Sequence, residues 1–329
     1  MQALIAMDAA LAADQQSEAS SSAWGYGGGG WSEGEQSGLA VFSCNSCGGE
    51  IVGDETLGAS SCPFCGNPVV MTSRFAGSLR PDMIIPFKLD KESALKALQN
   101  HYVGKKLLPA VFKESNHLDE IKGVYVPFWL YDADADAGIE YRATTVRSWS
   151  DRKYNYTETS VFRIYREGVI GFDKVPADGS RAIDDTLMES IEPFSLNDAV
   201  PFSTVYLAGY VANKYDVSSD ENSTRVNERI KNSTISAFQD TVTGYASVTH
   251  QTTNLRLLNN IVHYALFPVW LLSTSWEGKN YIFAMNGQTG KFVGDLPLDK
   301  RAARLNFLKV FGIIAASLII LSQVIISLI

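Results

Sequence analysis

The four cysteines of this chain form two pairs of a kind that binds metal ions. Cys44 and Cys47 stand in CNSCGGE, and Cys62 and Cys65 stand in CPFCGNP. A C-x-x-C turn directs both sulfur atoms toward one point, and the following glycine allows the close turn in which amide N–H groups approach the sulfurs. Two such turns supply the four thiolates that a tetrahedral Zn²⁺ ion requires. We therefore predict that Cys44, Cys47, Cys62 and Cys65 bind one zinc ion.

Two other uses of the cysteines are weaker. Two disulfides would suit a secreted protein, but the first residues lack the basic region of a signal peptide, and the chain has no further cysteine. A thioredoxin-like redox site needs one C-x-x-C that opens a helix, whereas here two of them flank a turn. With sulfur in all four positions, zinc has no open site for water, so the predicted ion is structural and not a Lewis acid.

A zinc ribbon over residues 41–72 would hold these ligands. Short apolar segments surround the two cysteine pairs, and we expect each to form a strand: 41–42, 51–52 and 69–70. So short a module buries little apolar surface, and the bound metal would supply its folding energy, on the order of 10–16 kcal/mol in small zinc peptides.

The charge of the chain bears on its partners. The formal net charge is −8, and no Lys or Arg precedes Arg74, although eight Asp and Glu residues do. The excess of negative charge therefore belongs to the N-terminal segment and the ribbon. Because nucleic-acid binding depends on Lys and Arg that neutralise phosphates, an acidic ribbon is a poor candidate for a nucleic-acid site.

The chain before the ribbon, residues 1–40, is acidic and rich in glycine and serine. We expect a flexible segment, with a linker over 14–40. Trp24 and Trp31 stand on either side of the run Gly27 to Gly30, and they could serve as anchors for a partner.

Residues 80–297 are expected to form an α+β domain with an internal duplication. The segment IPFKLDKESALKAL (85–98) is similar to EPFSLNDAVPFSTVYLAGY (192–210), and VPFWLYDAD (126–134) is similar to FPVWLLSTS (267–275). A chance match of two short patterns is the alternative.

The predicted halves cover about 84–190 and 191–297, and the second carries an insertion of which 219–242 would form a large part. In that insertion one helical face is expected to hold Val226, Ile230, Thr234, Ala237 and Phe238.

Hairpin-like segments are expected to follow each Pro-x-Trp segment, long ones in the first half and one in the second. The alternating segments 138–149 and 154–176 predict strands in the first half, and 279–297 predicts a hairpin with Asn286 and Gly287 in its turn. Trp129 and Trp270 would occupy related core positions.

Three aspartates in YDADADAG, namely Asp132, Asp134 and Asp136, stand at alternate positions of a predicted strand and so face one side. They do not match a calcium loop, because that loop needs glycine at its sixth position and glutamate at its twelfth. We interpret them as a solvated face that nearby arginines neutralise, with a weak divalent-cation site as the alternative.

We find no catalytic constellation in the sequence. The four histidines are scattered, and no metalloprotease, nucleophile-elbow or P-loop pattern occurs. His263, among apolar residues, is expected to be a core histidine. We therefore predict that the protein is not an enzyme.

The last twenty residues, Val310 to Ile329, carry no charge. At 1.5 Å per residue they span the roughly 30 Å hydrocarbon core of a bilayer, which predicts a transmembrane helix. Lys300, Arg301, Arg304 and Lys309 make residues 298–309 a basic juxtamembrane segment, so the positive-inside rule predicts a single-pass cell-membrane protein with its N-terminal domain in the cytoplasm.

Taken together, these segments resemble a known family. CPFCGNP, GVYVPFWLYDADADAGIEYRATTVRSWSD, YNYTETSVFRIYREG, PFSTVYLAGYVANKYDV and FPVWLLSTSWEGKNYIFAMNGQTGKFVGDLP are similar to segments of the zinc-ribbon membrane proteins of Gram-positive bacteria. The resemblance covers about residues 40–329. It implies a non-enzymatic partner of stomatin/prohibitin-like and phage-shock-type proteins that helps to recruit them to the membrane under envelope stress. Relatives are often labelled primosomal-helicase-like or general-transcription-factor-type zinc ribbons, but helicase motifs are absent here.

The predicted fold class is therefore α+β, with a zinc ribbon, a duplicated domain and a transmembrane helix. The function we expect is that of a membrane-anchored scaffold or adaptor, with the lipid bilayer and proteins as partners. One alternative is a nucleic-acid-associated ribbon protein. A second is a divalent-metal enzyme that uses the face of Asp132, Asp134 and Asp136.

Overall fold

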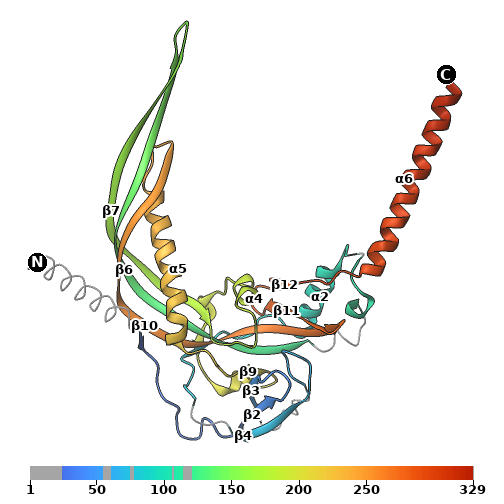
Figure 1. The fold of residues 1–329 in the computed structure, drawn as a ribbon. Helices are drawn as coiled ribbons and strands as arrows, with labels where there is room; N and C mark the ends of the chain where they lie inside the picture. Colours follow the sequence, from blue (N-terminus) through green and yellow to red (C-terminus); the bar gives the residue numbers. More distant parts are fainter. Residues whose placement is uncertain (1–23, 55–60, 75–77, 106, 114–120, 329) are drawn as a thin grey trace, which may run out of the picture.

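The strands of the chain join into one mixed sheet (Figure 1). The computed structural model describes residues 24–54, 61–74, 78–105, 107–113 and 121–328. The path through the sheet runs β12-β11-β10-β6-β9-β3-β2-β4, and four further strands pair alongside it. The strands are β1 (Gly25–Tyr26), β2 (Leu39–Cys44), β3 (Glu50–Asp54), β4 (Val69–Arg74), β5 (Met83–Ile84), β6 (Lys122–Ser150), β7 (Asn155–Asp178), β8 (Val200–Pro201), β9 (Val211–Asn213), β10 (Ser247–Trp276), β11 (Lys279–Asn286) and β12 (Phe292–Gly294).

In the described part of the chain, four α-helices and three short 3₁₀ turns accompany the sheet, which makes the fold mixed α+β, as predicted. They are α2 (Lys91–Tyr102), α4 (Asp185–Ser190), α5 (Ser219–Asp240), α6 (Lys300–Leu328), η1 (Ala110–Lys113), η2 (Leu196–Asp198) and η3 (Thr204–Leu207). The predicted helix over 219–242 and the predicted strands over 138–149 and 154–176 are confirmed.

The two longest strands, β6 and β10, form the centre of the sheet and pair antiparallel from Lys122↔Leu271 to Thr144↔Ser247. Residues 124–131 of β6 are all buried, whereas from Tyr131 to Ala143 only alternate residues are. A strand covered on both faces is apolar throughout, and a strand covered on one face alternates. The run VYVPFWLY therefore lies in the body of the molecule, and DADADAG begins an arm that projects from it (Figure 1).

Helix α5 covers one face of the arm. Ala133 and Ala135 of β6 share a buried cluster with Val226 and Ile230 of α5. The small alanine side chains let the helix axis come close to the strand, and the tyrosine hydroxyls of β6 donate to helix carbonyls; one example is Tyr141 Oη to Ile235 O at 2.7 Å. Of the face predicted for this helix, Val226, Ile230 and Thr234 are fully buried, Phe238 is half-buried and Ala237 is exposed.

This packing predicts the cost of truncating α5. Ile230 has no exposed side-chain surface, and Ile230→Ala would remove three buried carbons and leave a cavity against β6. We expect the free energy of unfolding to fall by about 2–5 kcal/mol in urea titrations. The control is Ser233→Ala on the exposed side of α5, which should change stability by less than about 0.5 kcal/mol. Equal effects would contradict this packing.

A buried ion pair fixes the start of α5. Arg225 Nη2 lies 2.9 Å from Asp178 Oδ1 at the end of β7, and Arg225 also pairs with Asp185 of α4. Burial raises the pKa of Asp178 to about 6, although Arg225 opposes the rise. The ion pairs of Arg225 thus join β7, α4 and α5, although burial makes the ionised form of Asp178 less favourable than in water.

The raised pKa of Asp178 predicts a pH dependence of stability. A carboxyl group whose folded pKa lies above its unfolded value stabilises the fold most below the unfolded pKa, and this contribution disappears as the pH rises through the folded pKa. We expect this contribution, on the order of 3 kcal/mol, to be lost between about pH 4 and pH 6. Asp178→Asn should remove that part of the pH profile of urea unfolding, whereas Asp295→Asn, at an exposed site, should leave it unchanged. Superimposable profiles of the Asp178 variant and the parent would contradict the assignment.

The two Pro-x-Trp segments lie side by side in β6 and β10, where Pro127 pairs with Leu266 and Pro268 with Tyr125. Trp129 and Trp270 are 1% and 5% exposed, so their predicted core positions are confirmed. Each indole N–H donates to a carbonyl just before a helix cap: Trp129 Nε1 to Val217 O at 2.8 Å, and Trp270 Nε1 to Leu89 O at 3.0 Å.

The order of elements around each tryptophan is also the same. β5 pairs parallel with β10 and leads to α2, which is capped by Asp90, while β9 pairs parallel with β6 and leads to α5, which is capped by Ser218. The segment that contains β9 and the start of α5 thus lies beside Trp129 as 85–98 lies beside Trp270. Segment 192–210, which the sequence matched to 85–98, contains two prolines and forms only β8 and short 3₁₀ turns.

The predicted linker is packed against the body in its described part, residues 24–40. Trp24 makes an edge-to-face contact with Tyr131 at 4.8 Å between ring centroids, and Trp31 Nε1 donates to Ser78 O at 2.7 Å. A Cβ at Gly28 would collide with Asp82, so the glycine run allows a close approach of the backbone. The two tryptophans are therefore intramolecular contacts. The part of the expected flexible segment over 1–23 lies outside the described residues.

Helix α6 ends the described chain and extends away from the body (Figure 1). Its first turn is capped by Asp299, whose Oδ1 accepts from the N–H groups of Arg301 and Ala302 at 2.8 and 3.0 Å. The helix is long and apolar enough over Lys300–Ile320 to cross a membrane, and none of its apolar stretch is buried. The chain therefore carries one candidate membrane-spanning helix near its C-terminus, as predicted.

Candidate metal centre

Two turns of the same geometry present the four cysteines. In the first, Gly48 N donates to Cys44 O, and in the second Gly66 N donates to Cys62 O, both at 2.9 Å. Gly48 and Gly66 have φ of +76° and +75°, a region that favours glycine because it has no Cβ. The glycine after each cysteine pair is thus required by the turn, as the spacing predicted.

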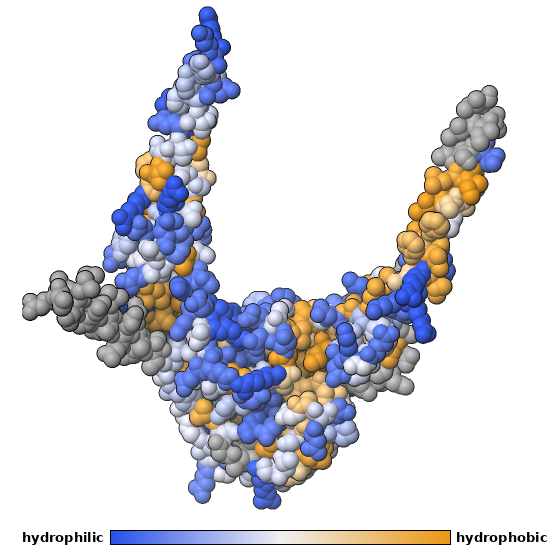
Figure 2. All heavy atoms as spheres, viewed as in Figure 1, coloured by the Kyte–Doolittle hydropathy of each residue, from blue (hydrophilic) through white to orange (hydrophobic). Residues whose placement is uncertain are grey.

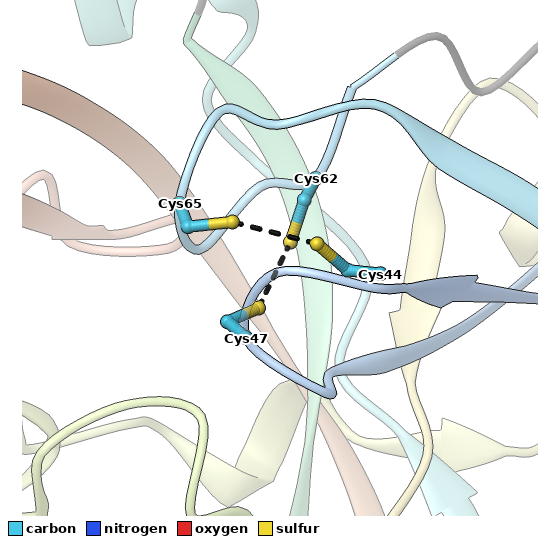
Figure 3. Close-up of side chains that lie close together, drawn as sticks. All are labelled: Cys44, Cys47, Cys62 and Cys65. Carbon is cyan, nitrogen blue, oxygen red and sulfur yellow. Dashed lines mark hydrogen bonds between the residues drawn. The ribbon is translucent and has the colours of Figure 1, made fainter.

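The sulfur atoms of the four cysteines form a compact group (Figure 3). Cys44 Sγ lies 3.5 Å from Cys65 Sγ, Cys47 Sγ lies 3.6 Å from Cys62 Sγ, and all four lie within 4.8 Å of one another. The edge of a tetrahedron around zinc would be about 3.8 Å for a Zn–S bond of about 2.3 Å. The group is therefore compatible with a metal site, and its donor set of four soft thiolates fits zinc.

The surroundings of the sulfurs differ in burial and in hydrogen bonding. Burial raises the pKa of the Cys62 thiol, so a cation would be needed to hold it as a thiolate. At Cys65 burial acts in the same direction, but hydrogen bonds from Asn67 outweigh it and lower the pKa to about 7. Asn67 Nδ2 also donates to Ser46 Oγ at 3.0 Å, which links the two turns.

The strands predicted around the cysteines are present, and they are continuous with the main sheet. β2 pairs antiparallel with both β3 and β4. β3 also pairs with β9 through Ile51↔Asn213 and Val52↔Ala212, and β9 pairs with β6. Phe42, Ile51 and Phe64 enter the same buried cluster as residues of β6 and β10. The group of four cysteines is therefore held at a fixed place on the domain.

The side chains of the three aspartates of β6 do not converge into a second candidate metal group in the described structure. Within the described part of the chain, the four cysteines are the one group of three or more metal-binding side chains that converges. Asp134 Oδ2 accepts from Asn259 Nδ2 at 2.7 Å, and Asp136 Oδ2 lies 2.9 Å from Arg256 Nη2. The predicted charged face is present, but its partners come from β10 and not from the arginines that follow in the sequence.

Asp132 has a different partner, His263. The Nε2 of His263 lies 3.4 Å from Asp132 Oδ2, and its Nδ1 lies 3.9 Å from Asp82 Oδ2. The side chain of His263 is 25% exposed, so it is a bridging residue between two carboxylates and not the core histidine that its apolar neighbours suggested. The pairing of β6 with β10 brings it there, and no local pattern in the sequence indicates it.

Sequence reasoning also missed the residues that support the cysteines from outside the two pairs. Asn67, which follows the second glycine directly, could have been noticed from its place in CGNP. Lys122 Nζ of β6 donates at 2.5 Å to the carbonyl oxygen of Ser61, which precedes Cys62, and only the fold could reveal that contact.

Comparison with known proteins gives a relative in Bacillus subtilis (strain 168), described as uncharacterized protein YdjG. The two sequences are 34% identical over 231 residues, which is 70% of this chain and 68% of the relative. The chain belongs to the family of YdjG. No family model matches the chain, and no solved structure matches it. Membership of the YdjG family therefore leaves the function to be argued from the metal centre and α6.

Proposed function

We propose that this chain is a membrane-anchored zinc-ribbon adaptor that presents protein-binding surfaces on the cytoplasmic side of the cell membrane. The main support for the proposal is that the same chain has four converging cysteines and an apolar helix that is not buried. Four sulfur ligands leave zinc no position for substrate, so the ion stabilises the ribbon. The helix then fixes the ribbon and domain at the bilayer, with the cations before it on the cytoplasmic side.

The duplicated domain is part of this proposal. The equal arrangement of β5 with α2 and β9 with α5, each ending at the carbonyl bonded by a buried indole, supports a common origin of the two halves. In that view α5 is the counterpart of α2, and the arm formed by β6, β7 and β10 is an elaboration that enlarges the surface that a scaffold offers.

The open edge of the ribbon is the surface that we assign to a protein partner. Among the described residues, β4 pairs only with β2, so its other edge is unpaired. Val70 and Met71 on it are 48% and 51% exposed. An extended peptide can add a strand at such an edge, with main-chain hydrogen bonds and contacts to alternate side chains. By resemblance, the partners would be stomatin/prohibitin-like or phage-shock-type proteins.

Site-specific photocrosslinking in living cells tests this function. A photoreactive amino acid at Met71 should crosslink to a stomatin/prohibitin-like or phage-shock-type protein, and more strongly under envelope stress. The same amino acid at Lys96, an exposed position of α2, is the control and should give no such product. If the Met71 position crosslinks no protein, or only the proteins that the Lys96 position also captures, the adaptor function is contradicted.

A further inference from the structure

Strand β7 forms one edge of the arm. Its residues 155–172 pair with β6 in continuous register, and among the described strands β7 pairs with β6 alone. An edge strand presents unpaired N–H and C=O groups, and soluble proteins commonly protect such an edge with lysine, proline or a β-bulge. Segment 155–172 contains no lysine and no proline, and the register shift between Tyr131 and Ala133 lies beyond it. The edge is therefore open to another strand.

The outer face of this edge, on the side away from α5, alternates apolar and charged residues in a symmetric order. Its exposed residues are, in sequence, Val161, Arg163, Tyr165, Glu167 and Val169. The apolar ones are each more than half exposed, and Figure 2 shows apolar and hydrophilic residues interspersed along the arm. Arg163 contacts Glu140 but remains 81% exposed, and Glu167 forms no ion pair with any described residue. Both charges are thus available to a neighbouring strand.

A second copy of β7 that runs antiparallel matches this order with itself. If Tyr165 lies opposite Tyr165 of the second copy, then Arg163 lies opposite Glu167, and Val161 lies opposite Val169. Opposite charges and apolar pairs at facing positions stabilise an antiparallel sheet. The two neighbouring registers that a two-fold axis allows would place Arg163 opposite Tyr165 or Val169 and leave both charges without a partner. The pattern therefore selects one register.

The face toward α5 favours the same register. Phe162 is 40% exposed, and it would lie opposite Gly168 of the second copy. A Cβ at Gly168 would lie 3.5 Å from the ring of Phe238, so the incoming Phe162 would cover the glycine beside another aromatic ring, an arrangement that stabilises glycine in antiparallel sheets. Ile164 would lie opposite Arg166, whose aliphatic stem can pack on it.

We propose that the chain forms a two-fold symmetric dimer through residues 159–171 of β7, so that the two arms continue as one antiparallel sheet. A second copy is the partner that we assign to this edge, because the strand of another protein would not require a charge order that is complementary to itself. β4 and α6 lie on other sides of the body than the arm (Figure 1). The dimer therefore goes beyond the proposed adaptor function and does not depend on it.

Sedimentation velocity of the full chain in detergent tests the dimer. The parent chain should sediment as a dimer. Glu167→Arg would place arginine opposite arginine at both charge pairs, and we expect the dissociation constant to rise about tenfold or more. Arg163→Glu together with Glu167→Arg should restore the parent value, because opposite charges again face each other across the axis. Glu158→Arg, at an exposed position of β7 outside the paired residues, is the matched control and should dissociate like the parent.

Photocrosslinking in living cells identifies the occupant of the edge. A photoreactive amino acid in place of Tyr165, at the two-fold axis, should give a product of twice the mass of the chain. A parent chain that sediments as a monomer, or a Tyr165 position that crosslinks only to other proteins, would overturn the dimer. Equal dissociation of the parent, the single variant and the double variant would overturn it as well, since a contact elsewhere, such as α6, would then join the copies.

Discussion

Replacing Cys62 by serine is expected to remove the metal and unfold the ribbon. Cys62 is 2% exposed and its sulfur lies 3.6 Å from that of Cys47. Structural zinc contributes on the order of 10 kcal/mol to the folding of small zinc-binding peptides. Without it, the ribbon strands are joined to the domain by two paired positions between β3 and β9 and by the burial of Phe42, Ile51 and Phe64. We expect metal content to fall from one ion per chain to none, and amide protection to be lost in β2, β3 and β4 in hydrogen-exchange measurements.

Amide protection in the rest of the domain is the internal control for the loss of protection in the ribbon. Protection in β6, β10 and α5 should remain, because most of the buried residues in the cluster that they share lie outside the ribbon strands, although Leu39, Val41 and Val52 belong to it. Ser73→Ala, on the exposed surface of β4, is the matched control and should keep both the metal and the protection. A Cys62→Ser chain that retains one tightly bound zinc ion and a protected ribbon would show that the cluster is not the site that stabilises this module.

Two arginines in the middle of α6 are expected to prevent membrane insertion. Leu318 and Ile320 are 60% and 65% exposed, so Leu318→Arg with Ile320→Arg disturbs no packing in the described structure. An arginine near the centre of a spanning helix costs about 2.5–3.5 kcal/mol on insertion scales, and two would cost about 5–7 kcal/mol. We expect most of the variant chain to leave the carbonate-resistant membrane fraction, measured by immunoblotting.

Two arginines placed in the basic segment before the hydrocarbon core are the control, because they add the same charge to α6 at a different position. Leu305 and Leu308 are as exposed as the central residues, at 60% and 61%, but they lie before the predicted hydrocarbon core. Leu305→Arg with Leu308→Arg should therefore leave the chain in the membrane fraction. If both double variants fractionate alike, α6 does not act as a spanning helix.

The parts of the fold that depend on local patterns could be predicted from the sequence. The glycine after each cysteine pair, the apolar segments beside the C-x-x-C turns and the uncharged run from Val310 are each determined by the local structure that the residues must form. So is the alternation of aspartate with alanine in β6, which placed the alanines on the buried side. In each case a single element decides the pattern.

The parts that depend on pairing between distant strands could not be predicted. His263 has apolar neighbours in sequence, but its carboxylate partners arrive through β6 and the segment before β5. The ribbon looked separate because its link to the domain is a three-residue strand, β9, in the middle of the chain. The sequence matched 85–98 to 192–210 on a Pro-Phe pair, whereas in the fold the segments that take similar places beside the two tryptophans are those around the helix caps Asp90 and Ser218.

X-ray absorption at the zinc edge of the full chain, purified from membranes, tests the central claim most directly. The account predicts one zinc ion per chain with four sulfur neighbours at about 2.3 Å and no nitrogen or oxygen neighbour. Such a site is closed to water and substrate, and it leaves the work of the protein to its surfaces. A coordination sphere that contains an oxygen from water, or a chain that carries no zinc, would contradict it.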